Sequence, residues 1–144
     1  MPRQLVDQPN AIIFVVDDDE SVRKSLRRLL RSAGFGVETF ASGAQLLART
    51  PRATDGVVIL DLRMPVQSGL EIQRELHDRG TPMRVIFITA HDDDDARTTA
   101  MARGAVGFVR KPFDQAVLLE LVEQAVSQQA RAAGVAPRTR GAAQ

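Results

Sequence analysis

The sequence AIIFVVDDDE at residues 11–20 places six apolar residues directly before four acidic ones. The apolar part shows no alternation with polar residues, which is typical of a β-strand that is buried on both faces. Further apolar runs at 57–60, 85–88 and 106–109 have the same character, and 36–40 is a weaker candidate. These five short strands predict a parallel sheet.

Segments with apolar residues at helical spacing separate the strands. Ser42 is a suitable N-cap for one of them, and Gly34 and Gly80 are suitable C-terminal stops. The order βαβαβαβαβα predicts an α/β fold, namely a single doubly wound domain with helices on both faces of the sheet. We expect the helices at residues 22–33, 42–50, 70–80, 92–103 and 117–126, the fourth with a thin apolar face.

The composition fits one folded domain, since the chain has 144 residues, 44% of them hydrophobic, and a net charge of +1. This near-neutral balance argues against direct nucleic-acid binding by the segment. The absence of cysteine favours a reducing cytoplasm. Because there is no secretory signal pattern and no apolar run of about 20 residues, we expect no membrane contact and a cytoplasmic protein.

We divide the chain into three parts. Residues 1–10 are an N-terminal extension and residues 11–128 are the folded domain. The remainder, 129–144, is rich in Ala, Arg and Gly and has no periodic apolar face. We therefore expect a flexible tail or the start of a linker there.

Polar side chains follow the ends of the predicted strands, where an open parallel sheet has its working crevice. Carboxylates at 17–20 and at Asp61 would repel one another there, which favours a hard, oxygen-ligated cation such as Mg²⁺. Thr89 and Lys111 would add a hydroxyl and a positive charge. This set suits phosphoryl transfer with Asp61 as the nucleophile. Within the acidic run, Asp19 and Glu20 are read as helix-capping and first-turn residues.

Four motifs make the sequence similar to a known family: VVDDDESVR at 15–23, LDLRMP at 60–65, FITA at 87–90 and GAVGFVRKPF at 104–113. Their order and spacing resemble those of the CheY-like receiver domains of response regulators, and especially the FixJ-type branch. The resemblance runs from about residue 11 to 128. It implies a flavodoxin-like (βα)5 fold with a five-stranded parallel sheet in the order 2-1-3-4-5.

The resemblance also implies roles for the acidic residues. Asp61 would be the phospho-acceptor in a two-component phosphorelay. Asp18 and Asp61 would ligate Mg²⁺ directly, Asp17 would do so through water, and the backbone carbonyl of Arg63 would be a further ligand. Mn²⁺ is a candidate substitute for Mg²⁺.

Further roles follow from the same resemblance. Lys111 would bind a phosphoryl oxygen and form a cis peptide bond with Pro112. Thr89 would bind the phosphoryl group and act with Phe108 as the conformational switch, biasing an equilibrium that already exists. Many family members have Tyr where this chain has Phe108, so a hydroxyl contact is lost here.

Two residues are expected to tune the lifetime of the phosphorylated state. Arg63 and His91 stand two positions after Asp61 and Thr89, and our hypothesis is that the bulky Arg63 hinders the attacking water. The aspartates at 92–95 are interpreted as structural, because a helix dipole stabilises carboxylates at its N-terminus.

The implied partner is a histidine kinase or a histidine phosphotransfer domain. It would dock at the first helix, which carries basic residues at 23, 24, 27, 28 and 31. Phosphorylation would control an output domain or another partner, including transcription if a helix-turn-helix domain follows, and would tune homodimer formation. The chain would be no enzyme beyond self-catalysed phosphorylation and dephosphorylation.

Two alternatives stay open from the residues. One is a haloacid-dehalogenase-like phosphatase, with Asp17 as nucleophile and Asp19 as acid. The acidic pair that this family carries after its lysine has no clear counterpart here. The other is an interaction module that works without phosphate.

Overall fold

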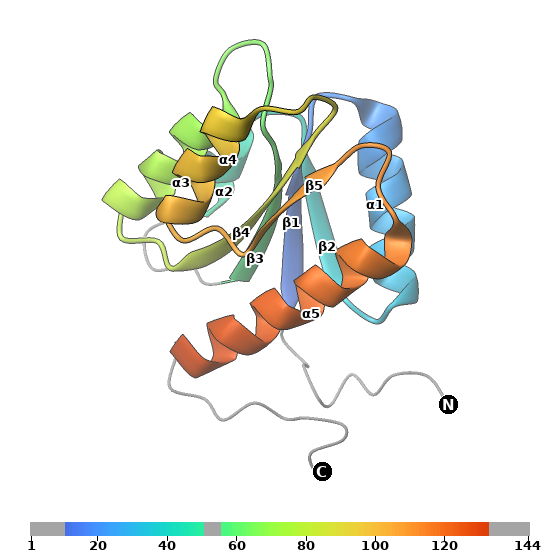
Figure 1. Cartoon of the computed structure of the whole chain (residues 1–144). Helices are drawn as coiled ribbons and strands as arrows, with labels where there is room; N and C mark the ends of the chain where they lie inside the picture. Colours follow the sequence, from blue (N-terminus) through green and yellow to red (C-terminus); the bar gives the residue numbers. More distant parts are fainter. Residues whose placement is uncertain (1–10, 51–55, 133–144) are drawn as a thin grey trace.

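A computed structural model describes residues 11–50 and 56–132, which form five strands that alternate with five helices (Figure 1). The elements are β1 Ile12–Val16, α1 Glu20–Ser32, β2 Gly36–Phe40, α2 Gly43–Arg49, β3 Gly56–Asp61, α3 Gly69–Asp78, β4 Met83–Thr89, α4 Asp94–Ala102, β5 Gly107–Arg110 and α5 Gln115–Ala132.

All strand pairs are parallel, and their order in the sheet is β2-β1-β3-β4-β5. This confirms the doubly wound fold and the strand order 2-1-3-4-5. The register places Val16 beside Leu60 and Asp61 beside Ile88. The carboxyl ends of β1, β3 and β4 therefore reach the same edge of the sheet.

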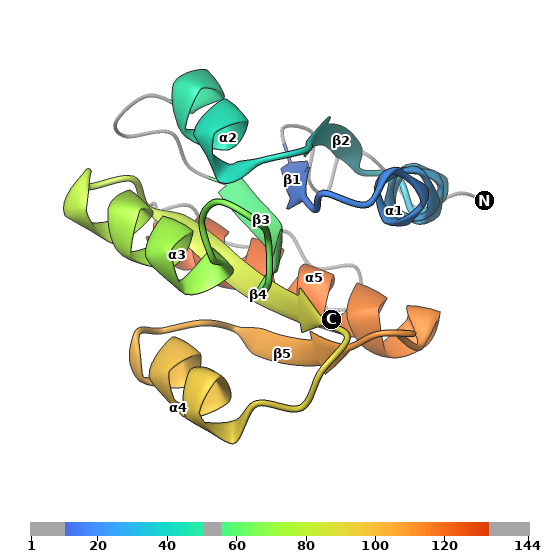
Figure 2. The same ribbon diagram turned by 90° about the horizontal axis from the view of Figure 1, so that it is seen from above.

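Two hydrophobic clusters cover the two faces of the sheet, and Figure 2 shows the helices divided between them. Ile13 and Val15 pack on the face that α1 and α5 cover, whereas Phe14 and Val16 pack on the face covered by α2, α3 and α4. Since neighbouring residues of β1 from Ile13 to Val16 are buried on opposite faces, the strand needs apolar side chains at each of these positions. This is the physical reason for the unbroken apolar runs.

Helix ends follow the expected capping chemistry. Asp19 is the N-cap of α1, and its side chain accepts a hydrogen bond from the Ser21 N–H at 2.9 Å. Ser42 caps α2 in the same way. Gly34 follows α1 with a φ of 97°, a left-handed conformation that glycine adopts without a steric cost.

The last helix differs from the sequence prediction. We expected the tail to begin at residue 129, but α5 continues to Ala132. Gln129 is buried at 8% exposure, so α5 packs against the domain as far as this polar residue, whereas Arg131 is exposed. The remaining tail residues, 133–144, and the extension at 1–10 lie outside the described residues.

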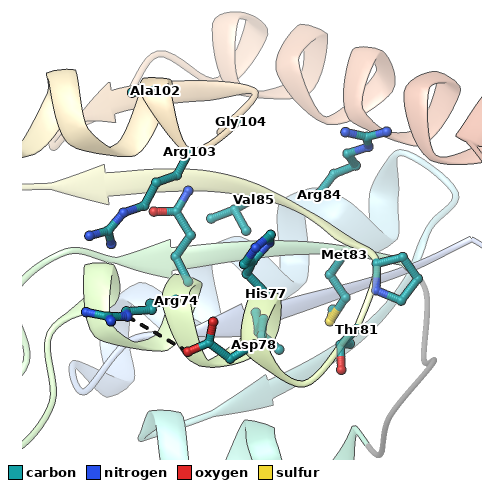
Figure 3. Close-up of a pocket in the computed structure, with 13 residues that line it drawn as sticks. Arg74, His77, Asp78, Thr81, Met83, Arg84, Val85, Ala102, Arg103 and Gly104 are labelled. Atoms are coloured by element: carbon teal, nitrogen blue, oxygen red, sulfur yellow. Dashed lines mark ion pairs between the residues drawn. The ribbon is translucent and has the colours of Figure 1, made fainter.

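A cavity of about 650 Å³ lies at the amino end of the sheet, between α3, β4 and α4 (Figure 3). Its rim carries basic side chains, among them Arg74, Arg84 and Arg103. The residues predicted for the functional site are not among those that line it. Across residues 11–50 and 56–132, no helix combines the length and the apolar character that crossing a bilayer requires.

Candidate functional site

Three carboxylates converge at the carboxyl edge of the sheet. Asp17 and Asp18 follow β1, Asp61 ends β3, and one oxygen of each lies within 4.8 Å of the others. Asp17 is fully buried and Asp61 is 4% exposed, whereas Asp18 lies at the surface. Because β1 and β3 are neighbours in the sheet, their ends bring together residues that are more than forty positions apart in the sequence.

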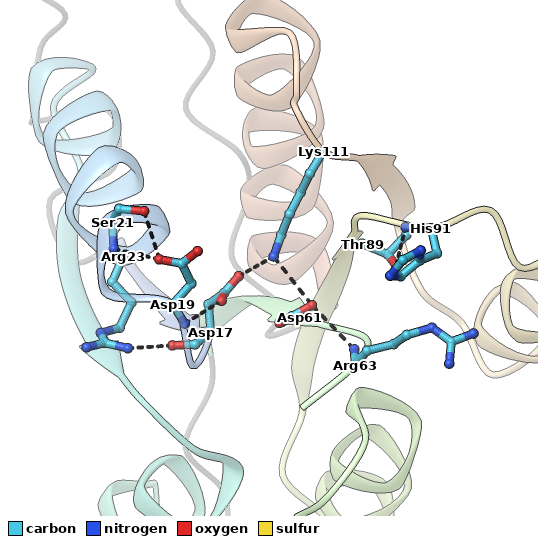
Figure 4. A network of polar contacts seen from close by, with 9 residues as sticks. All are labelled: Asp17, Asp19, Ser21, Arg23, Asp61, Arg63, Thr89, His91 and Lys111. Carbon is cyan, nitrogen blue, oxygen red and sulfur yellow. Dashed lines mark hydrogen bonds and ion pairs between the residues drawn. The ribbon is translucent and has the colours of Figure 1, made fainter. Parts of the chain in front are cut away.

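Lys111 reaches into this cluster from the end of β5 (Figure 4). Its Nζ lies 2.8 Å from Oδ2 of Asp17 and 3.6 Å from Oδ1 of Asp61. The Lys111 N–H donates a hydrogen bond to the Thr89 carbonyl at 2.6 Å, and the peptide bond to Pro112 is cis. Backbone contacts with β4 thus fix the point from which the ammonium group extends.

The electrostatics of the cluster shift two pKa values. Burial and the nearby Asp17 carboxylate raise the pKa of Asp61 to about 6, although Lys111 opposes the change. Burial lowers the pKa of Lys111, but contact with Asp17 and the charge of Asp61 outweigh it, so the net direction is upward. At pH 7 the ionised form of Asp61 therefore exceeds the protonated form by about ten to one. Asp61 is thus mostly a carboxylate at this pH, and it lies beside the Lys111 ammonium group.

The donor set fits a hard divalent cation. Every candidate ligand is an oxygen, and the Lys111 ammonium group offsets only one of the three carboxylate charges of the cluster, which leaves negative charge for a cation to neutralise. Mg²⁺ prefers a few carboxylates together with water, and the exposed Asp18 leaves the site open to water. The residues present are therefore suited to Mg²⁺.

The loop after β3 folds back over Asp61. The Arg63 N–H donates a hydrogen bond to Asp61 Oδ1 at 3.3 Å. Where α3 begins, a Cβ on Gly69 would lie 2.6 Å from the Asp61 carbonyl oxygen and 2.9 Å from the Phe87 ring. Only glycine permits this close approach, so Gly69 is a site-shaping residue that the motif reading missed.

Thr89 and Phe108 lie on neighbouring strands beside the cluster. Thr89 is buried, and its Oγ1 accepts a hydrogen bond from the His91 N–H at 3.2 Å. Phe108 is half-buried, with its ring centroid 5.9 Å from that of Phe87. The Arg97 guanidinium lies 5.9 Å from the Phe108 ring centroid, within the range of a cation–π contact. The sequence did not predict this role for Arg97, because Arg97 lies on α4 and Phe108 on β5.

The Asp92–Asp95 run has a second role beside the structural one. Asp93 is the N-cap of α4 and Asp94 and Asp95 lie in its first turn, which agrees with the predicted structural role of these carboxylates at a helix N-terminus. In addition, Arg63 Nη2 lies 2.5 Å from Asp93 Oδ2, and Arg110 Nη1 lies 2.7 Å from Asp92 Oδ2. These two ion pairs tie the loop after β4 to the ends of β3 and β5.

Asp19 stays outside the cluster of acidic oxygens found within the described residues. Its Oδ1 accepts hydrogen bonds from the Ser21 hydroxyl at 2.8 Å and the Ser21 N–H at 2.9 Å. These two hydrogen bonds, the one from the hydroxyl having the larger effect, hold the pKa of Asp19 below its usual value. A carboxyl group stabilised in its ionised form is a poor general acid, which counts against the phosphatase alternative.

Comparisons with known proteins agree with this geometry. Residues 13–123 match the family described as response regulator receiver domain. The chain is 38% identical over 128 residues to response regulator protein TodT of Pseudomonas putida, covering 89% of this chain and 56% of TodT. It is 42% identical over 113 residues to transcriptional regulatory protein FixJ of Rhizobium meliloti, covering 78% of this chain and 55% of FixJ.

The solved structure of response regulator StyR is also similar. It has a TM-score of 0.82 and 42% identity, over 87% of this chain and 63% of that one. The chain spans about half the length of the curated relatives TodT and FixJ.

Proposed function

Because this chain belongs to the response regulator receiver domain family, we propose that Asp61 accepts a phosphoryl group from the phosphohistidine of a histidine kinase or a histidine phosphotransfer domain. The family consists of signalling domains of two-component systems rather than enzymes in the usual sense. The observation that carries the proposal is the position of Asp61, a buried carboxylate between two acidic neighbours and the Lys111 ammonium group.

The transfer step is a substitution at phosphorus. A carboxylate oxygen of Asp61 forms a bond to phosphorus while the P–N bond to the donor imidazole breaks, and the imidazole nitrogen keeps the electron pair of that bond. Asp61 is mostly ionised at neutral pH, so it needs no base. Because Lys111 Nζ lies 3.6 Å from Asp61 Oδ1, it would be within reach of a phosphoryl oxygen on Asp61 and would neutralise part of its charge.

A divalent cation belongs to this proposal. Asp18 and Asp61 would hold it directly, Asp17 through water, and the Arg63 backbone carbonyl would complete the protein ligands. Mg²⁺ is the expected ion and Mn²⁺ a substitute. When bound, the ion would neutralise part of the negative charge on the oxygens of the phosphoryl group during its transfer. The chain itself contributes the placement of the carboxylates, which the register between β1 and β3 supports.

The conformational response is proposed to run through Thr89 and Phe108. The Thr89 hydroxyl would exchange its hydrogen bond from the His91 N–H for one to a phosphoryl oxygen. Phe108 would then move toward the space behind Thr89. Since Phe108 has no hydroxyl, its half-buried position depends on packing against Phe87 and on Arg97 rather than on a hydroxyl hydrogen bond.

Loss of the phosphoryl group is proposed to be self-catalysed. Water would attack phosphorus, the bond to Asp61 would break, and inorganic phosphate and a free carboxylate would result. Arg63 and His91 border the path of this water in the proposed arrangement. The Arg63 backbone lies beside Asp61, whereas its side chain extends away from that residue, so a shielding role would require the side chain to turn back toward the phosphoryl group (Figure 4).

The wider role is a further proposal. The donor protein would dock on the exposed basic residues of α1, and the phosphorylated domain would tune homodimer formation and act on an output domain or partner. Curated relatives carry names of transcriptional regulators. Control of transcription is therefore the proposed output if a helix-turn-helix domain follows. We further propose that the protein works in the cytoplasm without contacting nucleic acid through this segment.

Phosphorylation by a small donor tests the proposal. The purified protein is incubated with Mg²⁺ and acetyl phosphate, and its intact mass is measured beside Asp61→Asn and Asp17→Asn. We expect one added phosphoryl group in the wild type and none in Asp61→Asn. Labelling of Asp61→Asn with loss of labelling in Asp17→Asn would support the phosphatase-like alternative instead.

A further inference from the structure

Asp93 joins two loops that border the phospho-acceptor. Its Oδ2 lies 2.5 Å from Arg63 Nη2, and its Oδ1 accepts a hydrogen bond from the Ala96 N–H at 2.9 Å. One carboxylate therefore holds the guanidinium of the β3–α3 loop and also caps the first turn of α4. The pair links residues thirty positions apart in the sequence.

Arg63 is anchored at its other end by the phospho-acceptor itself. Its backbone N–H lies 3.3 Å from Asp61 Oδ1. From there the side chain extends away from Asp61, as Figure 4 shows. The side chain points in this direction because its guanidinium is paired with Asp93 rather than with Asp61.

We propose that Asp93 is a positioning residue for the phosphorylated site: it holds the Arg63 guanidinium away from Asp61 and competes with the phosphoryl group for it. The inference rests on the proposed function, because it needs phosphorylation of Asp61. A phosphoryl group on Asp61 would add a charge of about −2, together with strong acceptor oxygens, beside the Arg63 backbone. Arg63 then has two anionic partners within the span of one side chain.

The ion pair with Asp93 is weak enough for a phosphoryl group to compete with it for the Arg63 guanidinium. The Arg63 and Asp93 side chains are 55% and 26% exposed, so their ion pair is partly solvated. Exposed pairs of this kind shift an equilibrium by about two- to five-fold. Removing the charge of Asp93 should free Arg63 to cover the phosphoryl group. Hydrolysis by water should then slow by a similar factor.

The capping role of Asp93 can be separated from its charge. Asparagine and serine cap helices about as well as aspartate does. Asp93→Asn and Asp93→Ser therefore keep the hydrogen bond to Ala96 and remove the ion pair. Asp94→Asn is the matched control, since it removes the same charge one residue later, at an exposed position in the first turn of α4.

The experiment follows the decay of the phosphorylated protein. Wild type, Asp93→Asn, Asp93→Ser, Asp94→Asn, Arg63→Met and the double variant Arg63→Met/Asp93→Asn are labelled with acetyl phosphate and Mg²⁺. The donor is removed, and the phosphorylated fraction is followed by intact mass. We expect both Asp93 variants to last about two- to five-fold longer than Asp94→Asn. In the Arg63→Met background, Asp93→Asn should have no further effect.

Two results would overturn the inference while leaving the proposed function intact. One is a decay rate for both Asp93 variants equal to that of Asp94→Asn. The other is a longer lifetime that persists in the Arg63→Met background, since the effect would then not pass through Arg63. A wild-type protein that takes up no phosphoryl group would overturn the proposed function, and the inference with it.

Discussion

The Lys111 ammonium group lies 2.8 Å from Oδ2 of Asp17, so a side chain from the end of β5 reaches the end of β1 across two intervening strands. This contact pulls Lys111 over Asp61, which sits between them at the end of β3. The ammonium group is therefore placed where an incoming phosphoryl oxygen would need a positive charge.

Removal of the Lys111 charge should raise the pKa of Asp61 further. Lys111 lowers this pKa while burial and Asp17 raise it to about 6. In Lys111→Met the larger of the two lowering effects is lost and only the Arg63 N–H hydrogen bond still opposes the rise, so we expect an Asp61 pKa clearly above 6 and slower phosphorylation by acetyl phosphate at pH 7. Carboxyl chemical shifts followed by NMR against pH would measure the change. Lys24→Met, on the exposed side of α1, is the control and should leave the pKa unchanged.

Asp61→Asn should stabilise the folded domain at neutral pH. The pKa of Asp61 is about 6 in the folded protein against 3.8 as the reference value, so the folded state binds the extra proton. The stability linked to protonated Asp61 is present below about pH 4 and is lost as the pH rises through about 6. Asp61→Asn avoids this loss, and we expect a gain of about 1–3 kcal/mol in the free energy of unfolding at pH 7.

Urea unfolding at several pH values would test this gain. The advantage of Asp61→Asn should shrink toward pH 4. Asp78→Asn, which removes an exposed carboxylate paired with Arg74, should change stability little at any of these pH values. A gain that did not depend on pH would mean that the charge of Asp61 is not its cause.

Asp18 and Asp19 should differ in their effect on metal binding. They are adjacent and both exposed, but only Asp18 belongs to the acidic cluster. We expect Asp18→Asn to weaken Mg²⁺ binding about ten-fold, equivalent to about 1.4 kcal/mol. Asp19→Asn keeps the N-cap and should bind Mg²⁺ like the wild type. Isothermal titration with MgCl₂ would compare them, and equal losses would place the ion elsewhere.

Gly69→Ala should disturb the site more than a change at another glycine. The added Cβ would lie 2.6 Å from the Asp61 carbonyl oxygen, so the start of α3 must shift. We expect a loss of about 1–3 kcal/mol in stability, together with slower phosphorylation. Gly80→Ala meets nothing within 4 Å and carries only the strain of its positive φ. Thermal unfolding and labelling rates of the two variants would separate these effects, and equal behaviour would argue against a tight contact at Gly69.

The sequence allowed the fold and the centre of the site to be predicted, because both depend on patterns that run along the chain. Apolar runs marked the strands, and the runs at 11–16, 57–60 and 85–88 each ended at a polar residue of the sheet edge, namely Asp17, Asp61 and Thr89. The contacts of Arg63 with Asp93 and of Arg97 with Phe108 were not predictable in this way. They join side chains from different elements, and no periodicity encodes such pairs.

The end of the last helix was misjudged for a related reason. Composition suggested a tail from residue 129, but α5 continues to Ala132, and Gln129 within it is buried. A polar residue at a packed position breaks the apolar stripe without ending the helix.

Chemical mapping of the phosphorylated residue tests the central claim most directly. The protein is labelled with acetyl phosphate and Mg²⁺, the acyl phosphate is reduced with borohydride, which converts a phosphorylated aspartate to homoserine, and the peptides are sequenced by mass spectrometry. We predict homoserine at position 61, with aspartate retained at positions 17 and 18. Homoserine at position 17, or at another residue with Asp61 unchanged, would contradict the assignment of Asp61 as the phospho-acceptor.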